Sequence, residues 1–255
     1  MRIRSLVKGA LTFVPGAVDL FPKPPPGPTS APSYYYGVWL KHLSLLAANG
    51  LDTAPAVVAE LGPGDTLGIG LGALLCGADK YYALDLLAYT ERKKNLAVLD
   101  ALVDLLRKRT PRPEKGFPDF AYSRGGELFP TEVLTDDRLA RSMSPARLAE
   151  IRKALTDSTG RSGSIVIEYR TPWDDAAVIE ADSVDLVVSQ SVLEHVDDLE
   201  HAYRALYQWL KPGGVMSHSI GLWSHGLTKE WNGHWAISEP MWTLMRGRRS
   251  FLINR

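Results

Sequence analysis

The chain has 255 residues, 45% of them hydrophobic, and its basic and acidic side chains balance at 29 each. This length suits one α/β domain with insertions or a small cap, and the balanced charge gives no overall positive field, so we expect no nucleic-acid partner. A single cysteine, Cys76, excludes an intramolecular disulfide framework and a cysteine-built zinc site, which fits a reducing compartment and predicts a cytoplasmic protein.

The first 32 residues predict an N-terminal arm followed by a linker. Residues 1–21 have a basic start and an apolar body that Lys8 and Pro15 interrupt, without a clear cleavage site. We expect a packing arm, with a surface-lying amphipathic segment in peripheral membrane contact as the alternative. Residues 22–32 are rich in proline and predict an extended spacer.

From residue 33 onward, helical and strand patterns alternate. The hydrophobic spacing and the turn residues predict helices over 33–50, 66–77, 91–109, 144–155 and 197–210. Apolar runs predict strands over 55–61, 80–87, 163–170, 183–192 and 213–222. This order predicts an α/β fold with a doubly wound, mostly parallel sheet, whose ligands bind at the carboxyl ends of the strands. Residues 110–160 are predicted as a lid-like insertion.

A glycine-rich turn follows the first predicted strand. Gly62 and Gly64 allow the backbone to approach a ligand, and Asp65 or Thr66 can cap the following helix. Gly68 and Gly72 lie four residues apart in that helix, so they share a face that can press on the sheet. The spacing G-x-G-x-x-x-G departs from the dinucleotide pattern G-x-G-x-x-G, so an NAD-dependent oxidoreductase stays an alternative, as does a tight turn without a ligand.

Acidic residues flank this turn in the positions that a nucleoside ligand requires. Glu60 lies two residues before Gly62, and Asp85 follows 23 residues after it, at the end of the next predicted strand. A carboxylate there can accept hydrogen bonds from both ribose hydroxyls of an adenosine.

Four motifs in order then resemble those of class I S-adenosylmethionine-dependent methyltransferases. They are "AELGPG", Asp85, "VDLVVSQSVLEHV" and "WLKPGGVM", and the resemblance covers residues 34–220. It implies a Rossmann-like class I fold and S-adenosyl-L-methionine as cofactor. More loosely, "YYYGVWLKHL", "WNGHW" and "GRRSFLINR" resemble a bacterial subgroup that modifies small molecules or cell-surface sugars.

The resemblance also implies the roles of individual residues. Glu60, Gly62 and Gly64 would lie beside the amino-acid part and the ribose of the cofactor, and Asp85 would hold the ribose hydroxyls.

Residues at the ends of the third and fourth strands complete the implied cofactor site. Ser189 and Gln190 would face the methionine part. Tyr169 is a candidate contact to the adenine, together with Arg170 and Trp173, because the usual acidic residue has no clear counterpart in "EYRTPWDD".

Methylation of a hydroxyl needs a group that accepts its proton, for which histidine is suited near neutral pH. The candidates are His218, His225 and His234, whereas His195 is expected to be at least as much structural as catalytic. The three candidates are seven and nine residues apart, which matches no compact ligand motif, so we expect no metal site. Cytosine C5 methylation is discounted because "SQSV" offers no cysteine, and adenine methylation because "NPPY" and "DPPY" are absent.

The remaining residues, 221–255, contain four tryptophans and predict a C-terminal cap or an acceptor platform. The resemblance implies two further strands after the fifth, which these residues do not supply, so the sheet is expected to be shortened or the chain to be a fragment. We predict a methyltransferase that acts at oxygen on a small-molecule or sugar-containing acceptor. A non-catalytic cofactor-binding or scaffold protein is the remaining alternative.

Overall fold

A computed structural model describes residues 3–17, 31–112, 129–173, 175–249 and 252–254 of the chain. The chain forms two compact units. We name the larger one the sheet unit, and it comprises the described residues of 26–190 and 203–218. The terminal unit comprises the described residues of 1–25, 191–202 and 219–255, so it joins segments from both ends of the chain.

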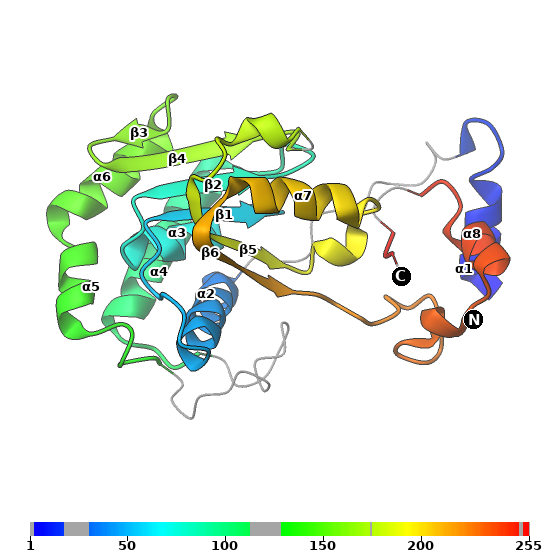
Figure 1. The fold of residues 1–255 in the computed structure, drawn as a ribbon, viewed down its shortest axis with the longest axis horizontal. Helices are drawn as coiled ribbons and strands as arrows, with labels where there is room; N and C mark the ends of the chain where they lie inside the picture. Colours follow the sequence, from blue (N-terminus) through cyan, green and yellow to red (C-terminus); the bar gives the residue numbers. More distant parts are fainter. Residues whose placement is uncertain (1–2, 18–30, 113–128, 174, 250–251, 255) are drawn as a thin grey trace. The chain divides into compact units, whose positions relative to one another are not determined.

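A six-stranded sheet forms the centre of the sheet unit (Figure 1). Its strands are β1 (Val57–Leu61), β2 (Lys80–Leu84), β3 (Arg161–Ser162), β4 (Ile165–Arg170), β5 (Val184–Gln190) and β6 (Leu210–Ser219). The spatial order is β3-β4-β2-β1-β5-β6; β1 pairs in parallel with β2 and β5, and β2 pairs in parallel with β4. This order confirms the predicted doubly wound, mostly parallel sheet. Within the described part of the chain no strand follows β6.

The short strand β3 is an addition that the sequence analysis did not predict. It pairs antiparallel with β4, with Arg161 opposite Val166 and Ser162 opposite Ile165. Gly163, with φ of 55°, lies in the tight turn between the two strands, where a residue without a Cβ is favoured.

Helices flank the sheet on both sides. In the sheet unit they are α2 (Pro32–Ala48), α3 (Gly68–Leu75), α4 (Arg92–Arg107), α5 (Asp136–Ser142), α6 (Pro145–Thr156) and most of α7 (Leu199–Trp209). Figure 1 shows α2, α3 and α4 along one side of the sheet and α7 along the other. Apolar residues of α2, α3, α4 and α6 pack with those of β1, β2, β4 and β5 in one hydrophobic core.

The glycines of α3 pack differently from the prediction. A Cβ at Gly68 would collide with the Tyr35 ring, and one at Gly72 would lie 3.0 Å from the Trp39 ring, so this face packs on α2 and not on the sheet. The face toward the sheet carries Gly70 instead, where a Cβ would collide with Tyr81 of β2. The absence of side chains on two faces of α3 thus lets it lie closely between α2 and the sheet.

The start of α3 also differs from the prediction that Asp65 or Thr66 caps it. Leu67 occupies the N-cap position and offers no side-chain cap. The buried Asn95 of α4 accepts a hydrogen bond from the Leu67 N–H at 2.9 Å. A residue 28 positions away in sequence therefore satisfies a donor that a local side chain was expected to satisfy.

Part of the predicted lid-like insertion forms regular structure. Ser144 caps α6 by accepting from Arg147 N–H, and Pro145 occupies the first turn, as predicted. Both α5, which was not predicted, and α6 contribute residues such as Leu139 and Ile151 to the core. The apolar stretch "FPDFAY", residues 117–122 of the insertion, lies outside the described residues, so the lid stays a prediction.

In the terminal unit, α1 (Ile3–Leu11) packs against α8 (Glu239–Arg246). Met245 of α8 is fully buried there, together with Trp242 and Leu227. None of the helices in the described part of the chain is long and apolar enough to cross a membrane.

Candidate functional site

The strand register brings the predicted cofactor residues of the sheet unit to one edge of the sheet. Leu61 of β1 lies opposite Leu84 of β2 on one side and opposite Ser189 of β5 on the other. Gly62 and Asp85 directly follow Leu61 and Leu84, so residues far apart in sequence reach the same edge. β1 is also where the chain's strand order reverses, because β2 and β4 follow on one side and β5 and β6 on the other. Ligands of open α/β sheets bind at such a switch point.

The glycine turn after β1 adopts backbone conformations that favour glycine. Gly62 has φ of 64° and Gly64 has φ of 73°, in the left-handed region. The Gly62 N–H donates to the Leu84 carbonyl at 2.8 Å, which fixes the turn to the end of β2. Thr66, in the same turn, is 3% exposed, and its Oγ1 has no hydrogen-bond partner among the described residues. A buried hydroxyl without a partner at this edge fits a polar ligand.

Glu60 is a buried carboxyl group just before the turn. It is 2% exposed, and its Oε2 accepts a hydrogen bond from the Tyr81 hydroxyl at 2.6 Å. Burial raises the pKa of Glu60 to about 8; hydrogen bonds from Tyr81 and the Gly70 backbone oppose this rise, and the nearby charge of Asp85 adds to it. Sequence analysis missed Tyr81, although a tyrosine in a central buried strand needs a partner for its hydroxyl.

Asp85 begins the loop after β2, and this loop is held by Tyr169. The Asp85 Oδ1 accepts from the Leu86 N–H at 2.8 Å, and burial raises the pKa of its carboxyl group. The Tyr169 hydroxyl donates to the Leu87 carbonyl at 3.0 Å and accepts from the Tyr89 N–H at 3.3 Å. Tyr169 therefore orders the loop that carries Asp85.

The side chains of the other two residues considered after the third predicted strand contact other partners, although the Arg170 carbonyl accepts a hydrogen bond from the Asp85 N–H at 3.1 Å. Trp173 is buried and packs edge-on against Trp209, with ring centroids 6.3 Å apart. The Arg170 side chain pairs with Glu168 at 2.6 Å.

Ser189 and His218 form a polar pair at the β5–β6 side of the edge. The Ser189 Oγ and the His218 Nδ1 lie 2.8 Å apart, and Ser189 is fully buried. Burial lowers the pKa of His218 to about 4, so its ring is neutral at pH 7. The His218 Nε2 is buried and has no hydrogen-bond partner among the described residues. Gln190, the last residue of β5, is 9% exposed.

Next to this pair lies His42 of α2, which sequence analysis did not single out. Its Nδ1 is 2.7 Å from the Ser217 Oγ, and the ring is almost fully buried. Burial lowers its pKa to about 3, and the charges of Lys41 and His218 act in the same direction. The sheet unit thus carries two neutral histidines on β6 and the helix beside it.

The structure divides the three candidate histidines between the two units. His218 belongs to the sheet unit, whereas His225 and His234 belong to the terminal unit. His225 lies against His195 and stacks on Trp223, and the buried His234 packs against Trp235 and Trp242. Unlike the buried Trp242, the tryptophans Trp223, Trp231 and Trp235 of this region are 45%, 65% and 54% exposed.

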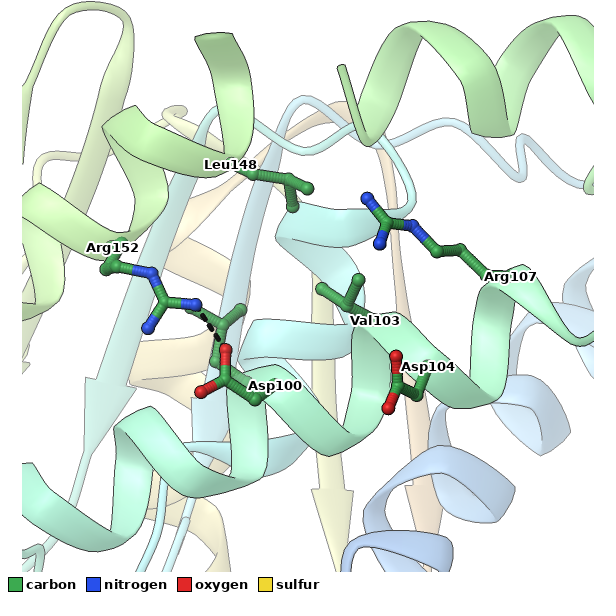
Figure 2. A pocket seen from close by; sticks show the side chains of 7 residues that line it. Asp100, Val103, Asp104, Arg107, Leu148 and Arg152 are labelled. Atoms are coloured by element: carbon green, nitrogen blue, oxygen red, sulfur yellow. Dashed lines mark hydrogen bonds and ion pairs between the residues drawn. The ribbon is translucent and has the colours of Figure 1, made fainter. Parts of the chain in front are cut away.

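A pocket of about 210 Å³ lies between α4 and α6 (Figure 2). An ion pair between Asp100 and Arg152 crosses it, and Val103, Asp104 and Leu148 also line it. It contains none of the residues at the carboxyl ends of the strands. The candidate site is therefore the strand edge and not this pocket.

Comparison with known proteins supports the enzyme class that the motifs predict. Residues 143–217, less than a third of the chain, match the family model of a methyltransferase domain. The matched segment includes α6, β4, β5 and α7 and most of β6, and with them Ser189 and Gln190. The match agrees with the predicted methyltransferase and its S-adenosyl-L-methionine cofactor. It does not distinguish the bacterial subgroup. No match was found among curated proteins.

Similar solved structures include two with methyltransferase names. A protein from Methanococcus maripaludis, assigned as an S-adenosyl-L-methionine-dependent methyltransferase, is 14% identical over 73% of this chain and 57% of its own, with a TM-score of 0.37. Phosphoethanolamine N-methyltransferase 2 from Haemonchus contortus, in complex with phosphomonomethylethanolamine and S-adenosylhomocysteine, is 17% identical over 89% of this chain and 39% of its own, with a TM-score of 0.38. The chain thus spans little more than half the length of the first and less than half of the second.

Proposed function

We propose that the protein transfers a methyl group from S-adenosyl-L-methionine to an oxygen atom of a small-molecule or sugar-containing acceptor. The observation that carries the proposal is the strand register, which aligns Leu61, Leu84 and Ser189 and so gathers the glycine turn, Asp85 and Gln190 at the switch point of the sheet. The methyltransferase-domain match over 143–217 supports it independently.

The residues at this edge fit the proposed cofactor. Gly62 and Gly64 leave room for its amino-acid part and ribose, and Thr66 offers a buried hydroxyl that has no partner among the described residues. Asp85 would accept hydrogen bonds from the ribose hydroxyls, and Tyr169 holds the loop that positions it. When bound, the cofactor supplies an activated methyl group on its sulfonium, so the chain must mainly align the acceptor with that group.

Ser189 and His218 support transfer to oxygen. An acceptor hydroxyl must lose its proton, and a neutral imidazole can take it. The His218 ring is neutral at pH 7 because of burial, Nδ1 contacts Ser189, and the buried Nε2 has no hydrogen-bond partner in the described part of the chain.

The proposal is tested by calorimetric titration of the full chain with S-adenosylhomocysteine, with NAD in parallel. The test variant is Asp85→Asn, and Asp79→Asn is its matched control because Asp79 precedes the same strand at its amino end. We expect S-adenosylhomocysteine to bind, Asp85→Asn to weaken binding at least tenfold, which is about 1.4 kcal/mol, and Asp79→Asn to bind as the wild type does.

Other outcomes overturn the proposal. Binding of NAD alone would indicate an oxidoreductase. Failure of the folded chain to bind either compound would refute the cofactor site. Cofactor binding without methyl transfer to any hydroxylated acceptor tested would favour a non-catalytic binding protein.

A further inference from the structure

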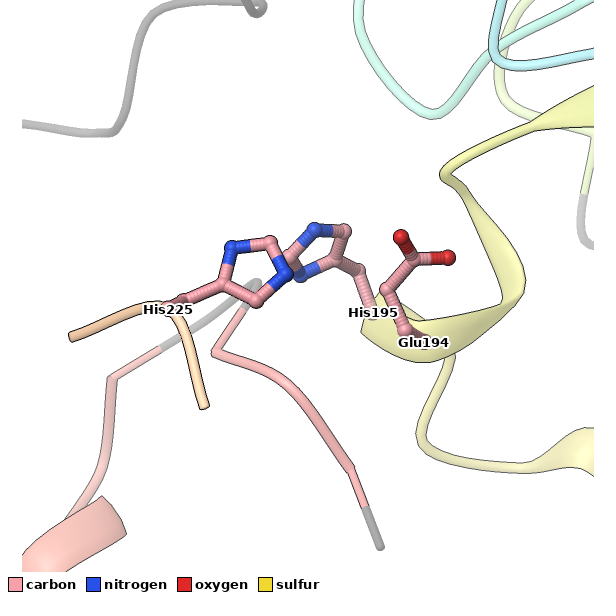
Figure 3. Close-up of side chains that lie close together, drawn as sticks. All are labelled: Glu194, His195 and His225. Atoms are coloured by element: carbon pink, nitrogen blue, oxygen red, sulfur yellow. The ribbon is translucent and has the colours of Figure 1, made fainter. Parts of the chain in front are cut away.

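Three side chains with metal-binding atoms converge in the terminal unit (Figure 3). Glu194 and His195 come from the 3-10 helix η3 (Leu193–His195), and His225 comes from the loop that follows β6. One ligand atom from each of the three residues lies within 4.8 Å of the other two. Figure 3 shows the two imidazole rings next to each other, with the carboxylate of Glu194 beside His195.

Glu194 holds a buried carboxyl group that hydrogen-bonds with the Ser191 side chain and with the backbone, while one of its oxygens has no partner among the described residues. The residue is 3% exposed, and its Oε1 accepts from the Gly221 N–H at 3.1 Å. Its Oε2 is buried and has no hydrogen-bond partner among the described residues. A Cβ at Gly221 would come within 2.7 Å of Oε1, so a glycine at 221 permits this close approach. A buried carboxylate oxygen that accepts no hydrogen bond is stabilised by a nearby cation or by protonation.

His225 reaches the cluster from a backbone conformation that is unusual for a residue with a side chain. Its φ is 47°, in the left-handed region. One face of its ring stacks on Trp223, with centroids 4.2 Å apart, and its edge meets His195, with centroids 5.2 Å apart. The His225 Nε2 is buried and has no hydrogen-bond partner in the described part of the chain. The loop therefore brings an imidazole whose Nε2 has no hydrogen-bond partner among the described residues to the cluster that contains Glu194.

We propose that Glu194, His195 and His225 bind a divalent transition-metal ion of the zinc class. Two imidazoles and one carboxylate are a ligand set that zinc accepts, with a further position left open for water or another oxygen ligand. A tetrahedral ion with bonds of about 2.0–2.1 Å holds its ligands roughly 3.3 Å apart, so small side-chain rotations would close the cluster around it. This departs from the sequence analysis, which considered His225 with His218 and His234 and expected no metal.

The test is direct metal binding by the full chain, without an affinity tag and after treatment with a chelator. Zn²⁺ affinity is measured by competition with a coloured chelator, and Co²⁺ by the visible absorption that it acquires in a protein site. The test variants are Glu194→Gln, His195→Ala and His225→Asn, because asparagine tolerates the left-handed backbone at 225. His201→Ala is the matched control, since His201 is an exposed histidine of the same unit.

We expect the wild type and His201→Ala to bind one Zn²⁺, and each test variant to bind it at least about tenfold more weakly, with circular dichroism unchanged. Absence of Zn²⁺ and Co²⁺ binding by the folded wild type would overturn the metal site. Binding that all three test variants retain would overturn it as well. These results are independent of the titration with S-adenosylhomocysteine, so the metal site and the proposed function can fail separately.

Discussion

The buried carboxyl group of Glu60 gives a quantitative prediction about stability and pH. Burial raises its pKa from 4.5 to about 8 in the folded chain. Because the folded state holds the proton more tightly than the unfolded state, the associated stability is fully present below pH 4.5 and is lost as the pH rises toward 8. Each pH unit within that window costs about 1.4 kcal/mol. Between pH 5.5 and 7.5 the wild type should therefore lose roughly 2–3 kcal/mol through this group.

The substitution Glu60→Gln removes the titration and keeps a group that can accept from the Tyr81 hydroxyl. Urea unfolding at several pH values should show the free energy of unfolding of the variant rising relative to the wild type by roughly 2–3 kcal/mol from pH 5.5 to 7.5. Titrating groups that do not interact with Glu60 are common to both proteins and cancel in the difference. The control is Glu132→Gln, an exposed carboxyl group of the same unit, which should follow the wild type. A constant difference between Glu60→Gln and wild type would show that Glu60 ionises normally and would refute the reasoning.

Two further predictions concern the same edge of the sheet. Gly70→Ala should lower the free energy of unfolding by about 1–3 kcal/mol in urea, because the added methyl group collides with the buried Tyr81 ring; unchanged stability would show that the helix can move away. The His218 ring should show no imidazole titration by NMR between pH 5.5 and 8, because burial lowers its pKa to about 4, and a midpoint above pH 6 would contradict its placement.

The sheet could be predicted from sequence because two separate patterns indicate its strands. Apolar runs such as residues 183–192 are typical of strands buried on both faces, and the helical segments between them require parallel connections. The packing of α3 could not be predicted in this way. Gly68, Gly70 and Gly72 differ only in which neighbour each one faces, and that depends on α2 and β2, whose positions no local pattern specifies.

The sequence predicts those residues of the candidate cofactor site that directly follow the end of a strand or form the turn after it. Gly62 and Asp85 are placed by the ends of β1 and β2, so local sequence suffices to bring them to one edge. Asn95 and Tyr81 act through long-range hydrogen bonds to Leu67 and Glu60, and no spacing in the sequence marks such pairs. What signals them is unmet hydrogen-bonding capacity, since a buried amide or hydroxyl must find a partner somewhere in the fold.

The same reasoning explains why the Glu194, His195 and His225 cluster is not evident in the sequence. Compact metal motifs repeat their ligands at short helical or turn spacings, but here two adjacent residues meet a third one 30 positions later. Their convergence depends on a left-handed backbone at His225 and on a glycine at 221 that admits the carboxylate. Each of these features looks like an ordinary loop residue by itself. Only together do they leave a buried oxygen and a buried nitrogen that have no hydrogen-bond partners in the described part of the chain, and a cation would satisfy both atoms.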